Sequence, residues 1–286
     1  MTSWVRARPL PRSEAPAERP FLFETNEGGL CANFNQFLYA YSFAALQGGK
    51  KPLIVYDMLN CISPGFSLIK DTFADMSGVS FVDSMAPSAV SLKRNLTRVM
   101  ETMRGLPLET LRATAQDIFK WNSKLTPIVK EIFDKASLPA AFDLGIHIRA
   151  GDKITTREMA SISIDKYVAA TKKYQLDAGL DELHIFIMTD TIPLRAAFIK
   201  KADPSWKVYY LPTPLPQPDG HIQAAFNNSP RRLKTTAYNY FMAELMIIQS
   251  IPDILCTLSS NVGRFLYYTV EHNDGIMSLD LKMAAV

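Results

Sequence analysis

The sequence has few of the residues that build metal sites or disulfide frameworks. Its three cysteines, Cys31, Cys61 and Cys256, lie far apart and form no C-x-x-C pair. Its four histidines show no H-E-x-x-H or similar ligand spacing. The pattern argues against a zinc knuckle, a zinc-protease site and a disulfide-stapled core.

Long apolar runs and long basic runs are also missing. No apolar run reaches the roughly 18–20 residues that cross a bilayer, and the opening residues, MTSWVRARP, lack the apolar region of a signal peptide. The formal net charge is only +3, without a basic run that carries interleaved aromatics. We therefore expect no integral membrane segment and no nucleic-acid partner. We expect a cytoplasmic protein, with a lumenal domain separated from its anchor as the alternative, and the oligomeric state stays open.

The 286 residues are enough for two modest α/β domains. Residues 1–20 are rich in Pro, Arg and Ala, so we expect a disordered arm. From Phe21 onward, apolar strand-like runs alternate with amphipathic helical stretches, which is typical of parallel βαβ units. The expected strands are Lys51–Met58, Val79–Asp83, Asp143–Ile148, Leu183–Thr189, Lys207–Leu211 and Asp253–Leu258. The expected helices are Phe34–Leu46, Leu108–Trp121, Ile164–Gln175, Leu194–Lys201 and Leu233–Ile248.

The stretch from Ser88 to Ala140 is expected to be mostly helical, without a clear strand. We place a boundary near residue 140, which gives an N-terminal α/β lobe at 21–140 and a Rossmann-like lobe at 141–286. Two such lobes are expected to face a cleft and to bind a ligand at the carboxyl ends of their strands.

The loops at the predicted strand ends carry the chemistry. Arg149 follows one strand and precedes a glycine, an acid and a second cation in the run RAGDK. A guanidinium can donate two parallel hydrogen bonds to a phosphate. A surface salt-bridge loop is the alternative for this cluster.

A second turn follows the strand near Cys256. Ser259 and Ser260 stand between that strand and the apolar helical run Phe265–Val270. Small hydroxyl residues there cap a helix. They also leave its free N–H groups open to an anion, which the helix dipole favours. A plain N-cap is the alternative.

Two further polar positions are less specific. Asp190 ends a predicted strand and is expected either to cap the helix that begins near Pro193 or to contact a ribose or base; the cap is favoured. Gly28 and Gly29 precede a helix that contains Asn33, and glycines let a backbone approach a ligand closely. Neither a G-x-G-x-x-G fingerprint nor a P-loop occurs.

Two motifs together resemble the superfamily of α1,6-fucosyltransferases, nodulation fucosyltransferases and protein O-fucosyltransferases. Gly145–Lys153 (GIHIRAGDK) is similar to the family's G-V-H-V-R-R-T-D-K, and Cys256–Tyr267 (CTLSSNVGRFLY) is similar to C-T-F-S-S-Q-V-C-R-x-A-Y. The order of the motifs, with Thr189-Asp190 between them, also fits. The resemblance covers residues 143–280 and is looser at the glycine-rich start, Gly28–Asn33.

The resemblance implies a GT-B-like fold in which the C-terminal lobe binds the nucleotide sugar. It implies an inverting glycosyltransferase that uses GDP-fucose without a metal or other cofactor, and no D-x-D carboxylate pair is present. Arg149 matches the arginine on the donor β-phosphate, His147 and Ser260 match donor-contacting positions, and Glu244 falls where the α1,6 branch has an acid that binds guanine. The expected donor-binding residues are Gly29, Asn33, His147, Arg149, Lys153, Asp190, Glu244, Thr257, Ser259 and Ser260, and the expected catalytic residues are Arg149, Glu158 and Asp152.

The sequence departs from the family motif beside the key arginine. Ala150 and Gly151 replace the family's second arginine and its threonine, which leaves the donor sugar open. Besides transfer of fucose to a glycan hydroxyl, we keep transfer of another sugar, such as xylose from UDP or a rhamnose, and a non-catalytic nucleotide- or glycan-binding protein. The chain resembles a minimal catalytic core, as in a microbial or virus-encoded enzyme. The partners would be a nucleotide-sugar donor and a glycan acceptor.

Overall fold

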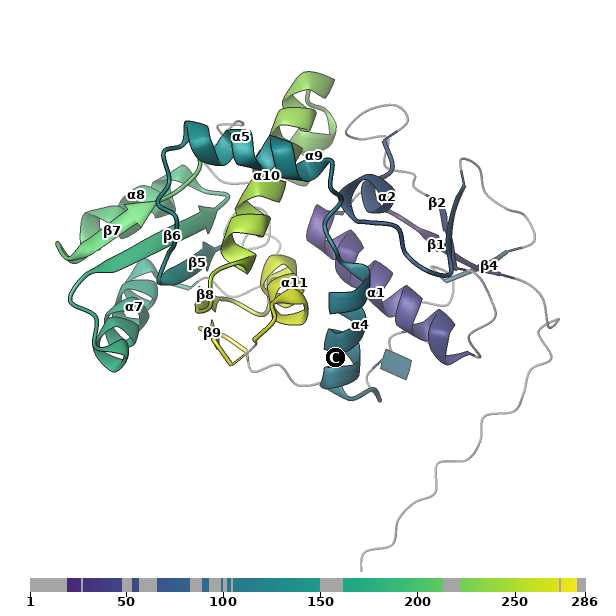
Figure 1. Cartoon of the computed structure of the whole chain (residues 1–286), viewed down its shortest axis with the longest axis horizontal. Coiled ribbons are helices and arrows are strands. Elements are labelled where there is room, and N and C mark those ends of the chain that lie inside the picture. Colours follow the sequence, from purple (N-terminus) through teal and green to yellow (C-terminus); the bar gives the residue numbers. More distant parts are fainter. Residues whose placement is uncertain are drawn as a thin grey trace, which may run out of the picture.

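The computed structural model describes residues 20–26, 28–47, 53–56, 66–82, 89–92, 99, 102–103, 105–149, 162–212, 222–272 and 274–281. These residues form two parallel β-sheets with helices packed against them (Figure 1). None of the helices in the described ranges combines the length and the apolarity of a membrane span.

The N-terminal sheet has the strand order β3-β2-β1-β4, and all its pairs are parallel. Its strands are short: β1 Phe21–Glu24, β2 Leu53–Tyr56, β3 Val79–Val82 and β4 Val90–Ser91. The helices α1 (Leu30–Leu46) and α2 (Leu68–Thr72) belong to this half. Because β1 lies between β2 and β4, the chain departs from it in both directions, and the loop after β1 occupies the switch point of the sheet.

The C-terminal sheet is also parallel and has the order β7-β6-β5-β8-β9. Its strands are β5 Leu144–Ile148, β6 Leu183–Thr189, β7 Trp206–Tyr209, β8 Ile254–Cys256 and β9 Ile276–Ser278. Its helices are α7 Ile164–Ala178, α8 Ile192–Lys201, α9 Gln223–Asn227, α10 Arg231–Gln249 and α11 Asn261–Thr269. The order reverses between β5 and β8, so the switch point lies between the ends of these two strands.

The two faces of the C-terminal sheet pack on different helices. Alternate residues of β5, such as Ile146, join a buried cluster with Tyr167 of α7 and Phe198 of α8. The opposite face packs on α10, where a Cβ added to Gly145 would lie 2.8 Å from Cγ1 of Ile248. Glycine at 145 therefore lets α10 approach β5 closely.

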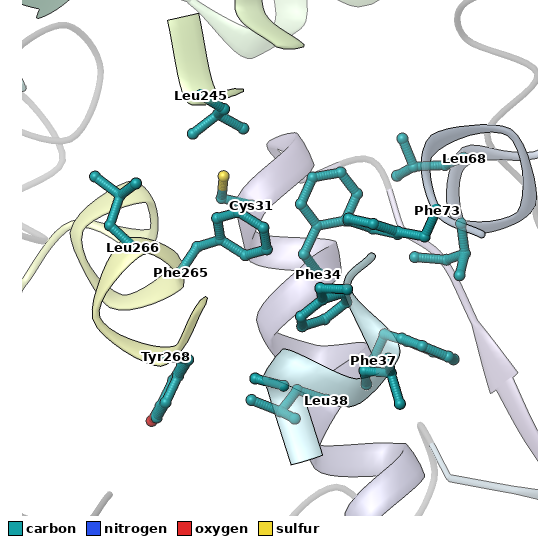
Figure 2. Packing of buried hydrophobic residues seen from close by; sticks show 14 of the residues in the cluster. Cys31, Phe34, Phe37, Leu38, Leu68, Phe73, Leu245, Phe265, Leu266 and Tyr268 are labelled. Atoms are coloured by element: carbon teal, nitrogen blue, oxygen red, sulfur yellow. The ribbon is translucent and has the colours of Figure 1, made fainter. Parts of the chain in front are cut away.

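A shared aromatic core joins the two halves of the chain. Phe265 of α11 lies 5.4 Å, ring centroid to centroid, from Phe34 of α1 and 5.3 Å from Phe119, which follows α4 (Leu108–Ile118). Figure 2 shows the side chain of Phe265 pointing from α11 toward Phe34 of α1. Buried aromatic side chains contribute a large apolar area and specific edge contacts. The core thus fixes α11 between the C-terminal sheet and the N-terminal helices.

A buried arginine completes this junction. Arg112 of α4 donates to the carbonyls at the end of α11, with Nη1 on Tyr267 and Nη2 on Val270 at 3.0 Å. Burial lowers the pKa of Arg112, although the neighbouring anionic groups oppose this. The last carbonyls of a helix lack intrahelical partners and carry partial negative charge, so a cation from the other half of the chain is well placed there.

The predicted fold is confirmed as two α/β lobes with parallel sheets. One prediction is wrong: the stretch from Ser88 to Ala140 contains β4, whose two residues pair with β1. The boundary near residue 140 stays a prediction, and α5 (Leu125–Lys135) lies before it yet packs on α10. The expected arm at 1–20 falls outside the described residues, apart from residue 20.

Candidate functional site

The switch point of the C-terminal sheet carries an ion pair. In the parallel register of β5 and β6, Ile148 pairs with Thr189, so the next residues, Arg149 and Asp190, emerge side by side. The guanidinium Nη1 of Arg149 contacts Oδ2 of Asp190, and their side chains are 13% and 15% exposed. The carboxylate holds the guanidinium plane at the sheet edge while part of it stays accessible.

On the other side of the switch point, Ser260 starts α11. Its Oγ accepts a hydrogen bond of 3.3 Å from the backbone N–H of Val262, which is the geometry of an N-cap. A Cβ at Gly263 would lie 2.1 Å from the carbonyl oxygen of Thr257, so glycine is required for α11 to start this close to β8. The positive end of the α11 dipole therefore lies at the same sheet edge as Arg149.

Two ionisable groups belong to the elements that pack together here, His147 on β5 and Glu244 on α10. His147 lies on the same face of β5 as Gly145, and Glu244 lies one helical turn nearer the carboxyl edge than Ile248. Burial, and then the charge of Arg149, lower the pKa of His147 to about 3. Its Nδ1 finds no hydrogen-bond partner within the described part of the chain. Burial raises the pKa of Glu244 to about 8, opposed by the charge of Arg195.

Arg195 links Glu244 to an exposed aromatic ring. Its guanidinium carbon lies 4.0 Å from the ring centroid of Tyr210, which follows β7 and is 40% exposed. Nη1 of Arg195 also donates to the carbonyl of Leu211 at 3.4 Å. Cation and ring thus support each other at the carboxyl end of β7, on the side of the switch point where Glu244 lies.

Among the described residues of the switch-point loop in the N-terminal sheet, side-chain amides make the organising contacts. Asn33 is fully buried, and its Oδ1 accepts from the N–H of Asn26 at 2.8 Å. Its Nδ2 lies within 3.1–3.3 Å of the carbonyl oxygens of Asn26, Gly28 and Gly29. The side chain of Asn26 donates to Oε1 of Gln36 at 2.7 Å. The amide of Asn33 is therefore committed to shaping the glycine loop.

The predicted residues fall into four groups. The register of β5 with β6 and β8 places Arg149, Asp190, Ser259 and Ser260 at one sheet edge; His147 feels the charge of Arg149, and Glu244 feels that of Arg195. Gly29 and Asn33 lie in the loop of the other sheet, while Thr257 is fully buried facing Tyr167 of α7. Asp152, Lys153 and Glu158 lie outside the described residues. The favoured helix-capping role of Asp190 is wrong, because Thr191 is the N-cap of α8 and no side-chain hydrogen bond caps that helix.

Sequence reasoning missed Asp280, Arg264 and Arg195. Asp280 follows β9, a three-residue edge strand without periodicity, although the apolar pair before Ser278 is a faint strand signal. Arg264 donates from Nε to the carbonyl of Leu258 at 2.9 Å. Such contacts from a side chain to a distant or turn carbonyl leave no mark in residue spacing. Within the described ranges, no group of three or more His, Cys, Asp or Glu is arranged to hold a metal ion.

No protein-family model matches the sequence, and no curated protein matches it. Solved structures do match in fold. Fucosyltransferase NodZ from Bradyrhizobium superposes with a TM-score of 0.58 at 13% identity, over 92% of this chain and 96% of that chain. POFUT1 in complex with GDP-fucose superposes with a TM-score of 0.50 at 10% identity, over 94% of this chain and 98% of that chain. Along nearly its whole length, the chain has the fold of fucosyltransferase NodZ.

Proposed function

We propose that the protein is an inverting, metal-independent glycosyltransferase that transfers fucose from GDP-fucose to a glycan hydroxyl. The observation that carries this proposal is the paired arrangement at the switch point of the C-terminal sheet. A guanidinium held by a carboxylate stands at the end of β5, and a serine-capped helix N-terminus stands at the end of the neighbouring strand β8. A fold alone does not fix a function, so the site must carry the argument.

The pairing register supports a diphosphate between these two elements. Gly145 and Ile146 pair with Ile254 and Leu255, and continuing that register brings Arg149 level with the turn after β8. The α11 N-terminus and the guanidinium then flank one anion, which a helix dipole and a bidentate cation both favour. The ion pair with Asp190 fixes the guanidinium before the donor arrives, so little ordering entropy is lost on binding.

Glu244 supports a guanine nucleotide. A carboxylate can accept two parallel N–H bonds from the Watson–Crick edge of guanine, whereas uracil presents carbonyl oxygens on both sides of a single N–H. Tyr210 and Arg195 provide a ring and a cation next to this carboxylate. His147, neutral at pH 7 because of its lowered pKa, offers a ring nitrogen without adding a charge beside the base.

In the proposed reaction, the acceptor oxygen bonds to the anomeric carbon while the bond from that carbon to the β-phosphate oxygen breaks. Negative charge grows on the departing diphosphate, where Arg149 and the α11 dipole stabilise it. The acceptor proton passes to a carboxylate base, for which Glu158 and Asp152 stay the candidates. The acceptor would enter from the N-terminal lobe, beside the glycine loop held by Asn33.

Binding and turnover of a panel of nucleotides test this proposal. We expect GDP to raise the unfolding temperature more than UDP does; a ligand at 100 times its Kd stabilises a protein by about 2.7 kcal/mol. We also expect slow release of GDP from GDP-fucose, lost in the Arg149→Ala variant, which should stay folded. Preferential binding and hydrolysis of a UDP-sugar would refute the donor assignment. Tight GDP binding without turnover on any glycan acceptor would favour a non-catalytic binding protein.

A further inference from the structure

The turn between β8 and α11 is held by a carboxylate that follows β9. Oδ1 of Asp280 accepts from the N–H of Leu258 at 2.8 Å, and Oδ2 accepts from the N–H of Ser259 at 3.3 Å. The hydroxyl of Ser259 also donates to Oδ2. One carboxylate thus satisfies three donors of a two-residue segment that precedes the proposed phosphate site.

A cation holds the same two residues through their carbonyl groups. Arg264 of α11 donates from Nε to the carbonyl oxygen of Leu258 at 2.9 Å and from Nη2 to that of Ser259 at 3.2 Å. The N–H groups of Leu258 and Ser259 therefore bond to an anion, and their C=O groups bond to a cation. The peptide between Leu258 and Ser259 is held through both its C=O and its N–H, and the peptide on each side of it is held through one group, which leaves the turn little freedom.

The carboxylate is itself well supported. Oδ1 of Asp280 accepts from the hydroxyl of Ser278 at 3.0 Å and from the N–H of Leu281 at 2.7 Å. Burial acts to raise the pKa of Asp280, but the hydrogen bonds that it accepts outweigh burial, so the pKa lies below its ordinary value. The group is an anion at neutral pH, and a second anion beside it would be repelled.

We propose that Asp280 is a positioning residue for the donor diphosphate: it orders the turn at Leu258 and Ser259 so that Ser260 and the first turn of α11 face the ligand. Its functional part rests on the proposed function. Ser259 was expected to bind the donor directly, whereas here its hydroxyl acts through Asp280. The diphosphate then lies on the Arg149 side of Ser260, away from the carboxylate.

Amide hydrogen exchange of the ligand-free protein tests the ordering directly. We expect the amides of Leu258 and Ser259 to exchange at least about tenfold faster in Asp280→Asn, because an amide side chain offers a single acceptor oxygen and no charge. Glu271→Gln, which removes an exposed carboxylate nine residues earlier, should leave this exchange unchanged. Unchanged exchange in Asp280→Asn would overturn the inference, whether or not any nucleotide binds.

A double-mutant cycle on GDP affinity tests the consequence. Asp280→Asn and Ser259→Ala should each weaken GDP binding about tenfold, and the double variant should be about as weak as either one, because the two residues act as a unit. The KM for the donor should rise more than kcat falls. Additive losses, or tighter GDP binding in Asp280→Asn, would overturn the inference, the latter by making Asp280 a competitor of the phosphate. Absence of GDP binding by the unaltered protein would refute the proposed function and leave the exchange result standing.

Discussion

The two sheets present their switch points with different chemistry. The loop after β1 is held by the neutral amides of Asn26, Asn33 and Gln36. The edge between β5 and β8 is held by ions, with Arg149 on Asp190 and Arg264 beside Asp280 around one turn. Within the described residues, the contacts that hold the first of these edges join neutral groups, whereas those that hold the second include charged groups.

Physical cost explains why the ions concentrate on one side. Charges at a partly buried edge must be paired and hydrogen-bonded, or desolvation destabilises the fold. In the proposed function, the charged groups of the C-terminal edge interact favourably with a diphosphate, and this offsets their desolvation. Amides can donate to and accept from sugar hydroxyls without such a cost, which suits the acceptor side in the proposed function.

Removing the guanidinium of Arg149 should have the largest effect on activity. We expect Arg149→Ala to lower kcat/KM for sugar transfer by about 10²–10³, the typical cost of losing one charge-stabilising donor. Steady-state kinetics measure the loss, and circular dichroism checks the fold. Asn33→Ala changes the loop after β1 instead, and it should leave GDP affinity within about twofold. A folded Arg149→Ala protein with most of its activity, or a large loss of GDP affinity in Asn33→Ala, would contradict the division.

Gly29 at the start of α1 and Gly263 in the first turn of α11 offer a matched pair. In Gly263→Ala the new Cβ would meet the backbone oxygen of Thr257 at 2.1 Å, whereas in Gly29→Ala the nearest atom is Oε1 of Gln223 at 3.5 Å, an ordinary contact. We expect Gly263→Ala to lower the free energy of unfolding by about 1–3 kcal/mol or more. Gly29→Ala should change it by less than about 0.5 kcal/mol. Chemical denaturation of both variants measures the difference, and equal losses would show that both loops are packed alike.

The polar residues at the ends of β5, β6 and β8 were largely predictable from the sequence, whereas the residues that hold them in place were not. The end of a long apolar strand such as Leu183–Thr189 can be read from the sequence, and in a parallel sheet the carboxyl ends of the strands lie at one edge. Arg149, Asp190 and Ser260 were found in this way. The strands β1, β4 and β9, of four, two and three residues, were not predicted. Without β9, Asp280 had no predicted position.

A second kind of miss concerns side chains that serve the backbone. Arg112 and Arg264 satisfy carbonyl groups of α11 and of the turn before it. Asn33 was predicted to contact the donor, yet every hydrogen bond recorded for its amide goes to the loop at residues 26–29. Sequence shows that a polar residue is near a loop, but the partner of its side chain is settled by packing.

Substitutions in the amide contacts around the loop after β1 should change the stability of the protein and not donor binding. Asn33→Ala removes a fully buried amide and leaves the N–H of Asn26 without its acceptor, so we expect a loss of about 1–3 kcal/mol in the free energy of unfolding. Gln36→Ala removes one partly buried acceptor and should cost about 0.5–1.5 kcal/mol. Urea titrations measure both values. A loss for Gln36→Ala as large as that for Asn33→Ala would mean that Asn33 does not organise the loop.

A further prediction concerns a pH dependence of stability that arises from Glu244. Its folded pKa of about 8 lies above the ordinary 4.5, so the folded protein holds a proton that the unfolded chain releases between these values. The free energy of unfolding should therefore fall as pH rises from about 4.5 to 8 and then level off, because the unfolded state binds fewer protons in that window. Glu244→Gln should remove this component from the pH profile of the unfolding temperature.

Donor binding should show the opposite trend. The guanine edge needs the carboxylate, so GDP affinity should increase about fivefold to tenfold between pH 7 and 8.5 as the proton leaves Glu244. Titration calorimetry in buffers of different ionisation enthalpy should detect release of close to one proton per GDP at pH 7. Glu244→Gln should bind GDP weakly, with an affinity independent of pH, while Glu271→Gln should keep the pH dependence. A pH-independent affinity in the unaltered protein would remove Glu244 from the base site and place the nucleobase elsewhere along the charged edge.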